Sequence, residues 1–331
     1  MSDIRINPTA APVRVPPIGL AQFGIPLGVC GLAGAWTAAE STLAAAEWVP
    51  DVLWAVGALL WLGVGGAYVV QRRRATGAFS ADLRHPIIGP FAAYAPIIAL
   101  LLMTHFGQYI PDAAAWIVWA LVFALLAVAA RLVAHWLIGD LTLSHLHPGY
   151  FLPVVAGSFV GSIGLSSVRA HDAADAAFGV GIFFWLVIGT IVTGRLITGG
   201  PLPGPVKSTL SVLLVPPAVG GIAWLFLNGG RADGVGFAFL GVMIFFVVVQ
   251  LILVPTYARL PFSAAFWTFT FPVASAANFT IRWCSSAPFP VSAAVAWLVL
   301  VLATIATTTV AVISITVLVL AAKRASGKEP T

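Results

Sequence analysis

Long apolar segments joined by short polar connections make up most of the chain. Ten of them are long enough, at about 20 residues, to cross the ~30 Å hydrocarbon core of a bilayer as helices. We predict these spans at residues 18–39, 51–70, 86–108, 113–138, 150–168, 173–197, 206–228, 232–256, 263–284 and 289–322. The last span exceeds the bilayer thickness, so we expect it to tilt or to project beyond the surface as helix.

The composition fits a membrane protein. The chain is 60% hydrophobic and only 8% charged, whereas soluble proteins carry about 25% charged residues, which excludes a soluble enzyme or a nucleic-acid-binding protein. The polar segment 1–17 lacks the features of a signal peptide. We therefore expect a cytoplasmic tail at 1–17, one transmembrane domain at 18–322 and a second cytoplasmic tail at 323–331.

The basic residues predict the orientation. An even number of spans places both termini on one side, and 13 of the 16 Lys and Arg residues fall there. These are Arg5, Arg14, Arg72, Arg73, Arg74, Arg84, Arg131, Arg195, Lys207, Arg259, Lys323, Arg324 and Lys328. Only Arg169, Arg231 and Arg282 fall on the other side. Because cytoplasmic loops are enriched in Lys and Arg, both termini are predicted to be cytoplasmic.

Prolines divide the spans into two classes. The odd-numbered spans carry interior prolines, and the even-numbered spans do not. The prolines chosen to mark the repeat lie 56 to 70 residues apart, at Pro26, Pro96, Pro153, Pro216 and Pro272. Prolines are also common in membrane helices generally, but the strict alternation favours five hairpins, each with one kinked and one straight helix.

The kinked helices are predicted to lie inside the bundle. A backbone broken in the bilayer is tolerated only where protein or a water-filled cavity shelters the freed carbonyl groups. We therefore predict an all-α polytopic membrane fold, with ten helices as five hairpins in a pseudo-five-fold arrangement. The inner kinked helices would line a central pore.

The positions of the acidic residues indicate which ions such a pore would pass. All eleven lie in tails, in loops or at span ends, which opposes both carboxylate-based proton coupling and cation conduction through an acidic ring. Helix dipoles and backbone amides can stabilise an anion instead. An apolar pore penalises strongly hydrated ions most, so we hypothesise passive flow of small monovalent anions such as chloride and nitrate.

Four segments resemble one family of membrane proteins. They are QFGIPLG at 22–28, HPGYFLP at 147–153, WTFTFP at 267–272, and Arg131 followed by Trp136. The first two and the Arg–Trp pair are similar to the TehA-like branch of the tellurite-resistance/C4-dicarboxylate transporter (TDT) family. The third is similar to a motif of the related plant slow-type anion channels. Ile88 departs from the pattern, since the family usually carries Arg there.

The resemblance implies a gated anion channel of the bacterial inner membrane, assembled as a homotrimer with a pore in each subunit. By match to the motif at 267–272, Phe271 would close the pore, and Phe91 in the third span is a second gate candidate. Position alone would make Phe271 one of 21 phenylalanines that pack helices. Other branches imply an alternative, an efflux carrier for malate or related C4-dicarboxylates, for sulfite or with a role linked to tellurite.

Arg282 and the histidines are the remaining candidate functional residues. Arg282, at the end of the ninth span, is either an interfacial cation that snorkels to the membrane surface or a vestibule charge that concentrates anions. The six histidines offer no convincing set of three metal ligands, and no nucleophile–base pair is evident. We predict no metal, no cofactor and no enzymatic activity. The expected partners are small inorganic anions or dicarboxylates, membrane lipid and further copies of the chain, but not nucleic acid.

Overall fold

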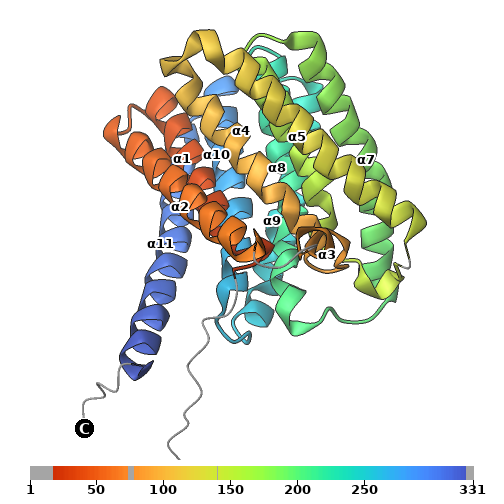
Figure 1. The fold of residues 1–331 in the computed structure, drawn as a ribbon. Helices are drawn as coiled ribbons and strands as arrows, with labels where there is room; N and C mark the ends of the chain where they lie inside the picture. Colours follow the sequence, from red (N-terminus) through yellow and green to blue (C-terminus); the bar gives the residue numbers. More distant parts are fainter. Residues whose placement is uncertain (1–17, 74–77, 140, 326–331) are drawn as a thin grey trace, which may run out of the picture.

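The computed structural model describes residues 18–73, 78–139 and 141–325, and within them every regular element is a helix (Figure 1). Helices labelled η are short 3₁₀ segments, except η6, which is a π-helix. In chain order the elements are η1 (Leu20–Phe23), α1 (Gly24–Leu43), α2 (Trp48–Arg73), α3 (Ala78–Arg84), η2 (Gly89–Ala93), α4 (Tyr94–Phe106), η3 (Gly107–Tyr109), α5 (Pro111–Ile138), η4 (Leu143–His145), η5 (Pro148–Tyr150), η6 (Leu152–Ala156), α6 (Gly157–Ser167), α7 (His171–Thr198), η7 (Gly204–Leu214), α8 (Val215–Leu227), α9 (Gly234–Tyr257), η8 (Ala264–Phe269), α10 (Thr270–Ser286) and α11 (Ser292–Ala325).

The helices make this a multi-pass membrane protein. Within the described ranges, nine of the ten predicted spans coincide with helices that are long and apolar enough to cross a bilayer. The predicted span 263–284 corresponds to η8 and α10, which are less apolar but pack among the other helices. The short helix α3 was not predicted.

The last helix, α11, is 34 residues long. At about 1.5 Å per residue it is longer than the hydrocarbon core is thick, and its final turns extend beyond the other helices (Figure 1). It continues to Ala325, so the predicted tail 323–331 begins inside the helix. The predicted tail 1–17, and Arg5, Arg14, Arg74 and Lys328 of the orientation count, lie outside the described residues.

The helices form two layers. In α1 and in the inner spans that contain α4, α6 and α8, 67 to 89% of the most apolar stretch is buried, whereas the value is 11 to 22% in α2, α5, α7, α9 and α11. The exposed faces of the second group carry large apolar side chains such as Trp116, Leu137 and Leu186. These faces suit contact with lipid. The division into inner odd-numbered and outer even-numbered spans agrees with the proline pattern.

The inner helices close into a ring. Helix α1 packs on α4, α4 on α6, α6 on α8, α8 on α10, and α10 back on α1. Each outer helix packs on the inner helix of its own hairpin, and α2, α5, α7 and α11 also contact the next inner helix. This cyclic order brings the two ends of the chain together and leaves an axis between five helices. We call the end of the bundle where the inner spans begin the near side, and the opposite end the far side.

Each inner span changes helix type at its proline. The span starts as a 3₁₀ or π segment and continues as an α-helix. Proline occupies the second or third residue of four α segments, at Pro26, Pro96, Pro216 and Pro272, and Pro153 is the second residue of the π-helix η6. In the first turn of an α-helix the N–H that proline lacks has no helical partner anyway. The kinks are therefore changes of helix type.

The His-Pro pair at the start of the third inner span links neighbouring hairpins. His147 Nδ1 accepts a hydrogen bond from the Gly149 amide at 3.1 Å, and its Nε2 donates to the Ile87 carbonyl at 3.0 Å. Tyr150 donates from its hydroxyl to the Pro86 carbonyl at 2.7 Å. Burial lowers the pKa of His147 to about 4, so the ring is neutral and keeps this tautomer.

Replacing Gly28 with Ala should destabilise the bundle. A Cβ atom there would overlap the side chain of Thr270, the first residue of α10. Overpacking of this kind costs about 1–3 kcal/mol. Thermal unfolding of the protein in detergent measures the loss. The control is Gly63→Ala on the lipid-exposed face of α2, where nothing lies within 4 Å. Equal stability of the two variants would contradict this packing.

The neutral state of His147 predicts a pH dependence of stability. Since its folded pKa of about 4 lies below the usual 6.5, it stabilises the fold above pH 6.5. As the pH falls from 6.5 to 4, the chain should lose up to about 3 kcal/mol. His147→Asn keeps an acceptor for the Gly149 amide and should lose less over this range. Unfolding measured from pH 7.5 to 4 tests this, and His171→Asn, at the exposed start of α7, should follow the wild type.

Candidate pore

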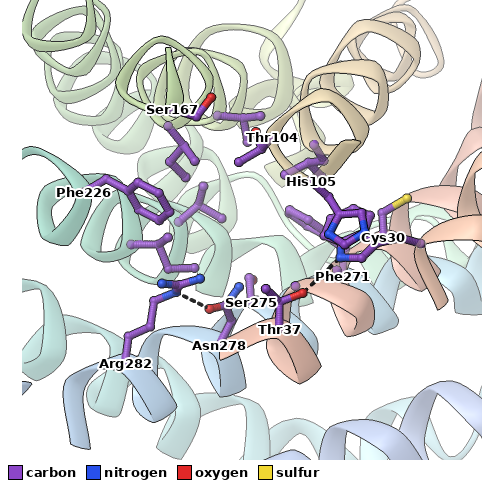
Figure 2. A pocket seen from close by; sticks show the side chains of 18 of the residues that line it. Cys30, Thr37, Thr104, His105, Ser167, Phe226, Phe271, Ser275, Asn278 and Arg282 are labelled. Atoms are coloured by element: carbon purple, nitrogen blue, oxygen red, sulfur yellow. Dashed lines mark hydrogen bonds between the residues drawn. The ribbon is translucent and has the colours of Figure 1, made fainter. Parts of the chain in front are cut away.

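A cavity of about 320 Å³ lies inside the ring of inner helices. Every inner span contributes to its wall, as Figure 2 shows for most of the side chains. Among them are Thr37 of α1, Thr104 of α4, Ser167 of α6, Phe226 of α8 and Ser275 of α10. A cavity that all five helices line is the axial opening expected of such a ring.

The cavity belongs to the far half of the bundle. Thr37, Ser167 and Phe226 lie in the last two turns of their helices. A second hollow of about 390 Å³ lies at the far ends of α1, α8 and α10, and it shares Phe226 and Arg282 with the axial cavity. The two hollows together lead from the far surface toward the axis.

Phe271 lies where the axial cavity ends. It lines this cavity and also a void of only about 10 Å³ on its near side. The small void is again lined from all five inner spans, by Leu27, Tyr94, Leu152, Val215 and Phe271 among others. It is no larger than about one water molecule. The buried phenyl ring therefore lies between a cavity of about 320 Å³ and a void of about 10 Å³.

The backbone around Phe271 is unusual for a membrane helix. Phe271 is the second residue of α10, directly after the 3₁₀ segment η8 and directly before Pro272. On the neighbouring helix α1, a Cβ atom on Gly31 would lie 2.9 Å from a ring carbon of Phe271. Gly31 thus provides the space that the phenyl ring occupies.

Phe91 lies elsewhere. It belongs to η2 and packs against Tyr94 and His147, with ring centroids 5.4 and 5.9 Å apart. It lines neither the axial cavity nor the small void. The nearby aromatic residue that does reach the axis is Tyr94, which sequence reasoning missed. Its position two residues before Pro96 gave no signal, since Thr270, two residues before Pro272, lines neither void.

Arg282 faces the opening on the far side. Its Nε donates a hydrogen bond to Asn278 Oδ1 at 2.8 Å, and its guanidinium lies 5.1 Å from the centroid of the Phe226 ring (Figure 2). Neither of the two ion pairs among the described residues involves it. Arg282 lines both hollows, and its role as a vestibule charge stays a prediction.

A histidine–aspartate pair lies on another wall. His105 Nε2 is 3.3 Å from Asp51 Oδ1, and its ring stacks on Trp54 at 5.2 Å. Trp54 in turn donates from its indole to Thr37 Oγ1 at 3.0 Å. The pair joins the last turn of α4 to the first turn of α2. Sequence reasoning missed it, because only the packed bundle brings these helix ends together.

No acidic side chain among the described residues lines the axial cavity. Asp51 lies behind His105, and Asp82 is paired with Arg72 at 2.8 Å near the ends of α2 and α3. The wall of the cavity therefore combines apolar groups and neutral polar groups with one guanidinium and one imidazole.

Comparison with known proteins gives one consistent family. Residues 18–318 match the SLAC1 family model, described as voltage-dependent anion channel. The chain is 28% identical to the tellurite resistance protein TehA homolog of Haemophilus influenzae over 268 residues, 79% of this chain and 80% of that protein. It is 27% identical to the S-type anion channel SLAH2 and 26% identical to the guard cell S-type anion channel SLAC1, both of Arabidopsis thaliana.

The matches to the plant channels and to the family model cover different shares of the proteins. About 80% of this chain aligns with each plant channel, but it spans only about half of their length, 52% of SLAH2 and 50% of SLAC1. The family model, in contrast, covers all ten spans almost to the end of α11. The chain therefore belongs to the SLAC1/TehA-type (TDT) family of anion channels and transporters.

Proposed function

We propose that the protein is a gated channel through which small monovalent anions, such as chloride and nitrate, flow passively down their gradients. Phe271 acts as the gate. The observation that carries the proposal is the place of the Phe271 ring, between an open cavity and a void of about 10 Å³ on one axis. A closed pore requires one point at which the axis is too narrow for an ion, and the Phe271 ring would provide that point.

The charged side chains that line the axial cavity favour the passage of anions over that of cations. The described wall holds Arg282 without a carboxylate partner and no acidic side chain. Most of the remaining wall is apolar, so an ion entering it loses much of its hydration. Selectivity would therefore follow the dehydration cost and favour large, weakly hydrated monovalent anions.

The position of Phe271 also supports gating. The change from 3₁₀ to α helix at Pro272 leaves the backbone beside the ring less constrained than the middle of a regular helix. A small backbone change there would swing the phenyl ring away from Gly31. The other four inner spans also change helix type near a proline.

Replacing Phe271 with Ala should open the pore. The ring that separates the two voids would be gone, so anion current through protein in planar bilayers should rise, by about tenfold or more if the ring is the main barrier. The reversal potential should follow the chloride or nitrate gradient. Phe91→Ala is the matched comparison, because that ring lines neither void. Unchanged current in Phe271→Ala would remove the gate, and an equal rise in Phe91→Ala would reassign it.

The same bilayer and vesicle measurements address the carrier alternative. A carrier for malate, sulfite or a tellurium oxyanion would give saturable flux driven by a pH gradient without a matching current. That result would replace the channel proposal.

We further propose that the near side is cytoplasmic and that the protein resides in the bacterial inner membrane. Arg72, Arg84, Lys207 and Arg259 lie toward the near side, whereas Arg169 and Arg231 lie in far-side connections. Reporters fused after residue 331 and inserted in the α8–α9 connection should report opposite compartments. A C-terminal reporter that is active outside the cytoplasm would reverse the orientation.

The chain is proposed to assemble as a homotrimer with one pore in each subunit. The large apolar side chains exposed on the outer helices can contact further copies of the chain as well as lipid. Native mass spectrometry from detergent should give three times the mass of the 34.5 kDa chain. A monomer under conditions that preserve activity would contradict the trimer.

A further inference from the structure

We propose that the axial cavity is a binding site for one small monovalent anion, and that protonation of His105 sets its affinity. The inference rests on the proposed function, because the site lies on the same anion path. It assigns to His105 and Asp51 a role that neither the motifs nor the gate explains.

The neutral polar groups of the cavity offer an anion few donors. Its four hydroxyl groups all donate to carbonyl oxygens of their own helices, at 2.6 to 3.1 Å. They belong to Thr37, Thr104, Ser167 and Ser275. Gln108 likewise donates to the His105 carbonyl. An anion therefore meets oxygen lone pairs at these hydroxyl groups, and the donors that remain are the Asn278 amide nitrogen and the charged groups.

Arg282 supplies the permanent charge. Asn278 holds its Nε and Phe226 lies against its guanidinium face, which leaves the two terminal amino groups with no acceptor among the described residues. Bidentate hydrogen bonding from such a guanidinium suits a planar anion such as nitrate, and its charge suits chloride.

His105 supplies a second charge that depends on pH. Its helix, α4, is not a ring neighbour of α10, and Figure 2 shows His105 and Arg282 reaching the cavity from opposite sides. Trp54 stacks on the ring, Phe106 and Tyr109 contact it edge-on, and its side chain is only 8% exposed. The ring is therefore held in place, and protonation adds charge at a fixed position.

The groups that face His105 define the charge balance. Asp51 from α2 is in contact with it, Arg282 from α10 and Cys30 from α1 line the same cavity, and Tyr109 lies on its own hairpin. Among the described residues, α5 and α6 place no titratable side chain on this cavity. With His105 neutral, Arg282 and Asp51 cancel, and protonation makes the local net charge +1.

The helix ends favour this switch. His105 is in the last turn of α4 and Asp51 is in the first turn of α2, where helix dipoles favour a cation and an anion respectively. Imidazole ordinarily titrates between pH 5 and 8. Acidification on the far side should therefore increase anion occupancy, and a bound anion should in turn favour the protonated ring.

Currents through the Phe271→Ala channel provide the first test. On changing the far-side pH from 7.5 to 5.5, chloride current should rise by about threefold, since one added charge concentrates anions at the mouth. Adding His105→Gln should abolish the rise, and adding Asp51→Asn should move its midpoint to lower pH. His171→Gln, an exposed far-side histidine, should leave the rise intact. The same pH response with and without His105 would overturn the proposal.

NMR of the wild-type chain in nanodiscs gives a test that needs no current. With ¹⁵N-labelled histidine, assigned by comparison with His105→Gln, the protonation midpoint of His105 should rise when 100 mM nitrate replaces a large impermeant anion. A midpoint that nitrate does not move overturns the site. Absence of current from Phe271→Ala at every pH would instead overturn the proposed channel, so the two failures are distinguishable.

Discussion

The fold depends on the fact that a bilayer core cannot hydrogen-bond to an open backbone. Wherever a helix is interrupted by proline or changes to a 3₁₀ or π turn, its freed carbonyl groups have to be sheltered by protein or water. All five interrupted spans here are inner helices, and regular α-helices surround them. The separation into two layers, the closed ring and the axis within it follow from this one requirement.

The space between the inner helices is small where α1 and α10 approach closely. The helix-type changes of α1 and α10 lie at similar depth, and small residues let these two helices approach closely. Gly28 admits Thr270, and Gly31 admits Phe271. The phenyl ring fills the space beside Gly31 between α1 and α10, and the cavity of about 320 Å³ begins beyond it.

Much of the fold followed from sequence. Hydropathy located the spans to within a few residues, and the proline alternation separated inner from outer helices, because both patterns report directly on contact with lipid. The helix type around each proline did not follow, since a missing N–H is compatible with a kink or with a 3₁₀ start. The pseudo-five-fold arrangement stays a prediction, although the cyclic order of contacts is the one it requires.

The candidate pore was predictable only in part. Phe271 came from a motif, and Arg282 lay near a helix end, where a snorkelling cation and a vestibule charge look identical in sequence. The pairing of His105 with Asp51 joins helix ends 54 residues apart and depends on how α2 leans on α4. Such pairings arise from the closure of the ring, about which a single sequence carries no signal.

The unequal sizes of the two voids bear on how the protein could be inhibited. Between the inner helices, an organic molecule has room in the axial cavity on the far side of the phenyl ring, where an anionic head could meet Arg282 and an apolar body could lie against Phe226. The void on the near side of the ring measures about 10 Å³, too little for an organic molecule. A compound that binds between the inner helices should therefore lie on the far side of the phenyl ring.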